Sequence, residues 1–149
     1  MNFKNLLDLI RPKHWIKNIF VFIVPLIHFQ KIDSLTLINL LLVFISFCFF
    51  SSAGYVLNDW IDRIKDSFHP QKKHRPFSSG KLNFNHMLII FFTFSSLGSI
   101  TTININGNAK LVLFLYFLTT ILYSTFLKNI ALLDIFTISF GFVLRLFSG

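Results

Sequence analysis

The sequence predicts an all-α protein, a polytopic bundle of helices that crosses a membrane several times. Only 13% of its 149 residues are charged, whereas 54% are hydrophobic, and Phe alone occurs 21 times. A water-soluble domain of this size devotes about a quarter of its residues to charged side chains. Several segments also approach the roughly 20 consecutive apolar residues that a helix needs to cross the hydrocarbon core. We therefore expect one transmembrane domain over residues 1–149, with much of its surface facing lipid.

Five membrane-spanning segments are expected along the chain. The first is short and contains Pro25, so the amphipathic stretch before it is needed to complete it. A soluble bundle would show a charged or polar face on each helix, but residues 111–122 are interrupted only by uncharged polar side chains. In the second span, the small residues 51–54 predict a close contact with another helix. The expected spans cover residues 17–29, 35–56, 86–103 and 110–127, with a fifth from residue 131 onward.

The distribution of Lys and Arg predicts the orientation of these spans. Ten of these cations lie in two segments, residues 4–17 and 63–81, and two expected spans separate the segments. Positive charge marks the cytoplasmic side of a membrane protein, whereas Lys31, Lys110 and a polar turn at 104–108 fall on the opposite side. We expect an integral protein of a bacterial-type plasma (inner) membrane. Cations confined to loops between apolar runs argue against a nucleic-acid partner.

Half of the acidic residues lie close together at the predicted cytoplasmic end of the second span. Asp59, Asp62 and Asp66 are spaced by three and four residues, which on one helix would place all three carboxylates on the same face. Such carboxylates repel one another, and their oxygens are ligands that Mg²⁺ prefers. The alternative is a solvated helix end whose Asp residues pair with Arg63 and Lys65. Acidic groups beside a membrane-embedded site are costly, which favours a functional cluster.

A basic loop follows the aspartates. Pro70 disfavours further helix, and Lys72 and Arg75 then supply cations of the kind that bind phosphate esters. We attribute Lys73 and Lys81 to the orientation signal alone. Farther along, Arg145 lies within an apolar span and is expected to face a cavity or a phosphate. Its partner is Asp134, or Asp134 only marks the cytoplasmic end of the fifth span.

The aspartate pattern Asn58-Asp59-x-x-Asp62-x-x-x-Asp66 resembles the first aspartate-rich motif of the UbiA superfamily of intramembrane transferases. A narrower resemblance is to its decaprenyl-phosphate phosphoribosyltransferase branch. This resemblance covers essentially the whole chain and implies about nine transmembrane helices around a cavity, with two aspartate motifs. Only the first motif is present, so we expect residues 1–149 to be the N-terminal half, either as a truncated or fragmentary chain or with the missing C-terminal half supplied separately. The marks of the branch are Arg11-Pro12-x-x-Trp15-x-Lys17-Asn18, His69-Pro70-x-Lys72-x-x-Arg75-Pro76, Tyr123-Ser124 with Lys128, and Leu133-Asp134 with Arg145.

The resemblance also implies a reaction, in which phosphoribose passes from phosphoribosyl diphosphate to a polyprenyl phosphate and diphosphate leaves. The catalytic, magnesium-binding residues would be Asp59, Asp62 and Asp66. The substrate-binding residues would be Asn58, Lys72, Arg75, Arg11, Lys17 and Arg145, with Arg11 and Lys17 holding a second phosphate. One alternative is transfer of a prenyl group to an aromatic acceptor. Two others are an inactive membrane scaffold or subunit, and a transporter-like bundle, which would place its Asp residues deep within the spans.

Overall fold

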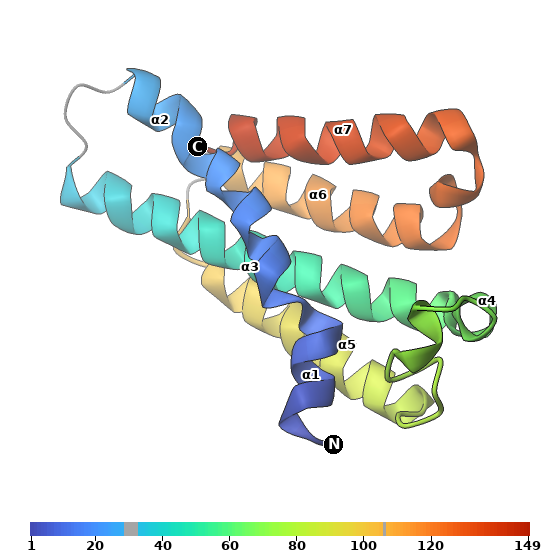
Figure 1. The fold of residues 1–149 in the computed structure, drawn as a ribbon. Helices are drawn as coiled ribbons and strands as arrows, with labels where there is room; N and C mark the ends of the chain where they lie inside the picture. Colours follow the sequence, from blue (N-terminus) through green and yellow to red (C-terminus); the bar gives the residue numbers. More distant parts are fainter. Residues whose placement is uncertain (29–32, 106) are drawn as a thin grey trace.

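A computed structural model describes residues 1–28, 33–105 and 107–149, and within them every regular element is a helix. The all-α prediction is therefore confirmed. The long helices lie roughly side by side, and the N-terminal segment crosses over α3 (Figure 1). The elements are α1 (Phe3–Ile10), the 3₁₀ helix η1 (Pro12–Phe22), α2 (Ile23–His28), α3 (Ser34–Ile61), α4 (Arg63–Ser67), η2 (Lys72–His74), α5 (Phe84–Thr101), α6 (Gly107–Thr125), η3 (Leu127–Asn129) and α7 (Ala131–Phe147).

Three helices within the described residues are long and apolar enough to cross a membrane: α3 with 28 residues, α5 with 18 and α6 with 19. They match the second, third and fourth expected spans, and α7 begins at Ala131, where the fifth was expected. The first expected span is not one regular α-helix, because it consists of most of η1 followed by α2. Pro25 has no N–H to donate to the Val21 carbonyl, which interrupts α-helical hydrogen bonding there. Phe29, the expected end of that span, and Lys31 lie outside the described residues.

Side-chain caps set the starts of two of the spanning helices. The Asp33 carboxylate accepts a hydrogen bond from the Thr36 backbone N–H, at 3.1 Å, and so begins α3. Asn83 and His86 form a reciprocal capping box at the start of α5. Each cap satisfies backbone N–H groups that have no partner inside the helix. This explains why α5 begins two residues before the position expected from hydropathy alone.

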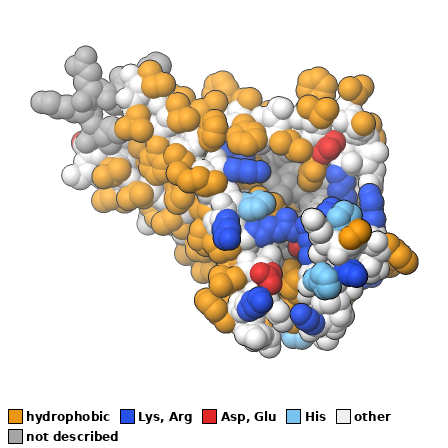
Figure 2. Space-filling view, in the orientation of Figure 1, with side chains coloured by type: hydrophobic (Ala, Val, Ile, Leu, Met, Phe, Trp, Pro, Cys, Tyr) orange, Lys and Arg blue, Asp and Glu red, His pale blue; other side chains and the backbone are white. Residues whose placement is uncertain are grey.

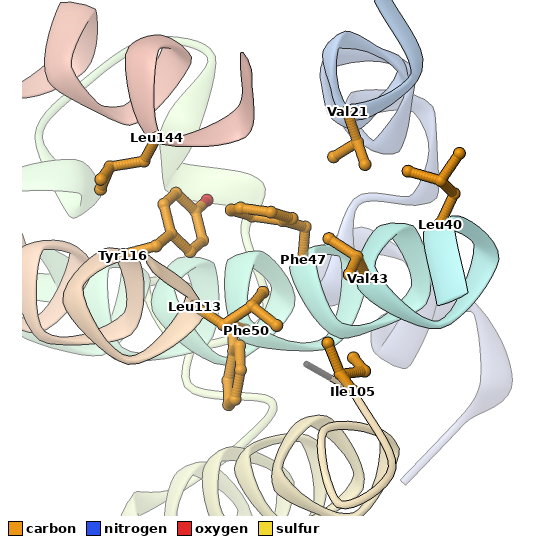
Figure 3. Close-up of a cluster of buried hydrophobic side chains, with 9 residues drawn as sticks. All are labelled: Val21, Leu40, Val43, Phe47, Phe50, Ile105, Leu113, Tyr116 and Leu144. Atoms are coloured by element: carbon orange, nitrogen blue, oxygen red, sulfur yellow. The ribbon is translucent and has the colours of Figure 1, made fainter. Parts of the chain in front are cut away.

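The centre of the bundle is α3, which packs against α1, η1, α5 and α6. One buried cluster joins α3 to η1, α6 and α7, with Phe47 and Tyr116 edge to face at its middle (Figure 3). The expected close packing at residues 51–54 is present, since all four are buried and a Cβ on Gly54 would collide with the Thr120 side chain of α6. A second buried cluster, which includes Leu9, Val56 and Met87, joins α1, α3 and α5.

The two cation-rich segments lie at one end of the bundle. Figure 1 places α4 and the turn between α6 and α7 at that end, α1 beside the second half of α3, and the start of α3 at the other end. On the face shown in Figure 2, Lys, Arg and His side chains gather at this end with carboxylates among them, while hydrophobic side chains cover most of the remainder. The fold therefore brings cations from distant parts of the sequence to the end of α3 that carries the aspartates.

Candidate functional site

Two of the three predicted aspartates share one arginine. Asp59 lies in the last turn of α3 and Asp66 in α4, and both side chains are buried. Nη1 of Arg75 donates to Asp66 Oδ2 at 2.6 Å and to Asp59 Oδ1 at 3.1 Å. The two carboxylates therefore hold a single positively charged group between them. Lys72 lies farther off, with its Nζ 3.8 Å from Asp66 Oδ1.

Arg11 adds a second guanidinium to Asp59. Its Nη2 lies 2.5 Å from Oδ1 and 2.8 Å from Oδ2 of that carboxylate. Arg11 is the residue between α1 and η1, and its φ of 51° is the positive value that turns the chain from one helix into the other. The guanidinium also lies over the Tyr55 ring, 5.1 Å from the ring centroid. These contacts hold the N-terminal segment against the end of α3 that is predicted to face the cytoplasm.

The third aspartate faces a different cation. Asp62 Oδ1 accepts a hydrogen bond from Lys128 Nζ at 2.6 Å, and the same nitrogen donates to Asn58 Oδ1 at 3.0 Å. Lys128 belongs to η3, in the turn between α6 and α7, and its side chain is 12% exposed. The resemblance had included this lysine as a mark, but no role was predicted for it. The sequence feature that could have indicated a role for Lys128 was its position in a turn predicted to face the cytoplasm.

The prediction that all three carboxylates share one helical face is wrong in part. The α3 helix ends at Ile61, and Asp62 is the residue that separates it from α4. Because this break interrupts the regular helical rotation, Asp62 contacts Lys128 while Asp59 and Asp66 contact Arg75. The alternative, in which the aspartates pair with Arg63 and Lys65, is not supported, since neither cation occurs among the described ion pairs. Arg63 donates to the Trp60 carbonyl and stacks on the Trp60 ring.

The donor atoms at Asp59 and Asp66 fit a magnesium ion. Within the described residues, no three His, Cys, Asp or Glu side chains converge as a complete set of metal ligands. Mg²⁺ is, however, usually held by one or two carboxylates together with substrate phosphates and water. Two buried carboxylates that already share one cationic nitrogen provide that partial set. Asp62 and Asn58 add oxygen atoms nearby, held by Lys128.

A cavity of about 240 Å³ opens between α3, α6, α7 and η1. Asn58 lines one part of it, and Arg145 and Lys17 line another. The expectation that Arg145 faces a cavity is therefore confirmed. Of the fifteen lining residues, eleven carry a hydroxyl, an amide or a cation: Lys17, Ser51, Tyr55, Asn58, Tyr116, Thr119, Thr120, Tyr123, Ser124, Thr137 and Arg145.

The described contacts bear on two expectations about cations. Arg145 does not pair with Asp134; its guanidinium bonds to Asn18, Tyr116 and Gly141, because Asp134 lies three turns away in the first turn of α7. Arg11 and Lys17 make different contacts, since Arg11 is bound to Asp59 while Lys17 lines the cavity. Sequence reasoning gave no role to Asn18 or Tyr116, which hold Arg145 in place.

Comparison with known proteins identifies the family. A sequence model of the UbiA prenyltransferase family matches residues 19–149, which is most of the chain. The chain belongs to the UbiA prenyltransferase family. It is thus an integral membrane protein of a transferase family, as the aspartate motif and the apolar helices predicted.

The curated relatives include a nodulation protein and decaprenyl-phosphate phosphoribosyltransferases. The nodulation protein NoeC of Azorhizobium caulinodans is 33% identical over 139 residues, which cover 93% of this chain and 45% of that protein. The decaprenyl-phosphate phosphoribosyltransferase of Corynebacterium glutamicum is 32% identical, over 98% of this chain and 46% of that protein. The enzyme of the same name from Mycolicibacterium smegmatis is 28% identical, over 97% of this chain and 46% of that protein. The chain spans about half the length of these relatives.

Solved structures agree with the UbiA fold. A structure described for digeranylgeranylglyceryl phosphate synthase in membranes has a TM-score of 0.81 at 26% identity, covering 96% of this chain and 50% of that chain. A UbiA homologue from Archaeoglobus fulgidus bound to GPP and Mg²⁺ has a TM-score of 0.82 at 20% identity, covering 97% of this chain and 52% of that chain. Because the sequence identity is only 20%, the similarity to the Archaeoglobus fulgidus structure supports a shared fold and nothing more. The described helices therefore correspond to about half of a UbiA-type bundle.

Proposed function

We propose that the protein transfers phosphoribose from phosphoribosyl diphosphate to a polyprenyl phosphate, with magnesium required for the departure of diphosphate. The observation that carries the proposal is the pair of buried carboxylates, Asp59 and Asp66, that share Arg75 at the end of α3. When bound there, magnesium would stabilise the negative charge that develops on the leaving diphosphate. The decaprenyl-phosphate phosphoribosyltransferases among the relatives support this choice of substrates.

The residues of this chain have separate roles in the proposed reaction. Asp59, Asp62 and Asp66, with Asn58, would hold the metal and so orient the diphosphate. Arg75 and Lys72 lie beside the carboxylates and are placed to neutralise phosphate oxygens once the carboxylates bind the metal. An oxygen of the lipid phosphate forms a bond to the anomeric carbon of the ribose, and the bond from that carbon to the diphosphate oxygen breaks. Both electrons of the broken bond leave with the diphosphate.

An apolar groove supports a lipid as the acceptor. It lies between α6 and α7 and is lined by Leu122, Leu127, Phe136 and Phe140, together with Thr119 and Thr137. The two threonines also line the polar cavity. A hydrocarbon chain in the groove would therefore lie next to a polar site, as transfer onto the phosphate end of a lipid requires. Because the relatives are about twice as long, the assays below use the complete protein that contains these residues.

The substrate assignment is tested in membranes that contain the complete protein and Mg²⁺. With labelled phosphoribosyl diphosphate and a polyprenyl phosphate, we expect the label to enter a lipid-soluble product, and we expect chelation of Mg²⁺ to prevent this. Transfer of a labelled prenyl diphosphate to an aromatic acid, without any phosphoribosyl lipid, would assign the protein to the prenylating branch. If well-folded protein forms neither product, the result would favour a membrane scaffold.

We infer that the aspartate end of the bundle faces the cytoplasm of the plasma (inner) membrane. The inference rests on the cations of α1, η1 and residues 63–81, which gather at that end (Figure 2). In a Cys48→Ala background, we expect a membrane-impermeant thiol reagent to label Asn108→Cys from outside intact cells and to label Ser79→Cys only after lysis. Both positions are exposed, so accessibility within the fold is matched. Labelling in the opposite pattern would reverse the orientation.

A further inference from the structure

Arg145 is a buried cation whose described partners are all neutral. Its side chain is only 7% exposed. Nε donates to Asn18 Oδ1 at 2.8 Å, Nη1 to the Gly141 carbonyl at 2.6 Å, and Nη2 to the Tyr116 hydroxyl at 2.8 Å. No carboxylate in the described part of the chain forms an ion pair with it. A buried charge without a counter-charge is costly, which indicates that an anion completes this site.

The guanidinium is held so that it can still receive an anion. Arginine has five N–H groups, and the three described bonds use one on each nitrogen. One N–H on each terminal nitrogen thus has no partner among the described residues. The aromatic rings of Phe47, Tyr116 and Phe142 lie around the guanidinium, with centroids 5.5, 4.7 and 5.6 Å from Cζ. This surrounding fixes its position and lowers the local polarity, which strengthens its attraction for an anion.

The same cavity links this cation to the aspartate site. Arg145 and Lys17 line the cavity, and so do Ser51 and Asn58 of α3. Ser51 and Asn58 are seven residues apart, so the cavity extends about 10 Å along the helix. Asn58 shares Lys128 with Asp62, which places the aspartate end next to the cavity. The cavity therefore has Asn58 at the end nearer the aspartates and a cationic part formed by Arg145 and Lys17.

We propose that Arg145 and Lys17 bind the 5-phosphate of phosphoribosyl diphosphate, while the pentose fills the cavity and the diphosphate points to the aspartates. This assignment rests on the proposed phosphoribosyl transfer. The hydroxyl groups of Tyr116, Tyr123 and Thr120 line the space between the two ends and suit a hydroxylated sugar. A prenyl diphosphate carries no second anionic group for the cationic part. The pair Arg145 and Lys17 thus selects a donor with phosphate at both ends.

Two partial ligands test the two ends of the cavity separately. Ribose 5-phosphate probes the cationic part, and magnesium pyrophosphate probes the aspartate end, both by calorimetric titration of the complete protein. We expect Arg145→Gln and Lys17→Gln each to weaken ribose 5-phosphate binding by about 10- to 100-fold, the loss of a charge-assisted hydrogen bond, and to leave pyrophosphate binding unchanged. Asp66→Asn should do the reverse. Lys13→Gln, an exposed cation on the same helix η1, is the matched control and should change neither.

Each result supports or overturns the assignment. If Arg145→Gln also loses pyrophosphate binding, the variant is misfolded, and the exposed Lys17→Gln decides alone. Partial recovery of ribose 5-phosphate binding in Arg145→Lys supports a role for the charge. Equal ribose 5-phosphate affinity in wild type, Lys17→Gln and every folded Arg145 variant overturns the assignment while phosphoribosyl transfer stands. A wild-type protein that binds a prenyl diphosphate but not ribose 5-phosphate overturns the proposed function itself, and this assignment with it.

Discussion

Replacing Asp62 or Asp66 by Asn is expected to reduce transfer by a factor of about 10³ or more, since metal stabilisation of a leaving group is worth several kcal/mol. The amide keeps the size of the side chain and one oxygen. In Asp62→Asn this oxygen could still accept the hydrogen bond from Lys128, and in Asp66→Asn it could accept the one from Arg75. The change therefore removes the negative charge of a proposed metal ligand and leaves much of the described contact network in place. Initial rates at saturating Mg²⁺, in the assay for phosphoribosyl lipid, measure the effect.

Arg63→Gln is the matched control for these two variants. Arg63 lies between the two aspartates in sequence, but its guanidinium stacks on the Trp60 ring at 4.0 Å and its Nη1 bonds to the Trp60 carbonyl. Its substitution changes the net charge by one, as the Asp variants do, without touching the carboxylates. We expect Arg63→Gln to keep most of the activity. Similar rates in all three variants would leave the aspartates without a catalytic role.

Asp59→Leu is expected to lower the stability of the metal-free protein by about 2–4 kcal/mol, because it leaves Arg11 without its carboxylate and Arg75 with Asp66 alone. The Asp59 side chain is 1% exposed, whereas Arg11 and Arg75 are 20% and 27% exposed, so water partly compensates the two cations. The substitution also removes the ion pairs that join Arg11, which follows α1, and Arg75, in the basic loop, to α3. Thermal unfolding in detergent with a chelator present measures it, with a thiol-reactive dye reporting exposure of the buried Cys48.

A second variant and a double variant make the stability prediction specific. Asp8→Leu removes the same charge from an exposed position in α1 and should leave the melting temperature nearly unchanged. Combining Asp59→Leu with Arg11→Leu should recover part of the lost stability, because one unpaired cation is then removed. Equal melting temperatures for Asp59→Leu and Asp8→Leu would show that the Asp59 ion pairs do not hold the N-terminal segment in place.

Hydropathy and charge were sufficient to predict most of the fold. The apolar runs predicted four of the helices to within a few residues, because a membrane span needs both length and low charge. The first span was predicted less well. Its apolar composition does not distinguish a 3₁₀ helix from an α-helix, and the change from η1 to α2 falls between Phe22 and Ile23, just before Pro25. The helix break at Asp62 was also missed, since the spacing of three and four residues assumes uninterrupted helix.

The composition of the site was predicted better than its contacts. Asp59, Asp66 and Arg75 lie near one another in the sequence, so local spacing was enough to place them together. Lys128 reaches Asp62 across 66 residues, and Arg145 reaches Asn18 across 127 residues. Such contacts depend on how whole helices pack, which neither periodicity nor charge specifies. For the same reason, nothing in the sequence indicated that Arg11 and Lys17 make different contacts, Arg11 with Asp59 and Lys17 at the cavity.

Anomalous scattering from Mn²⁺ tests the central claim most directly. The complete protein is crystallised with Mn²⁺ in place of Mg²⁺ and with pyrophosphate, and the metal is located from its anomalous signal. We predict a peak bound by the carboxylates of Asp59 and Asp66, with Arg75 moved from these side chains onto the pyrophosphate. A pyrophosphate bound elsewhere, with no metal peak at the aspartates and Arg75 still bridging them, would contradict the account.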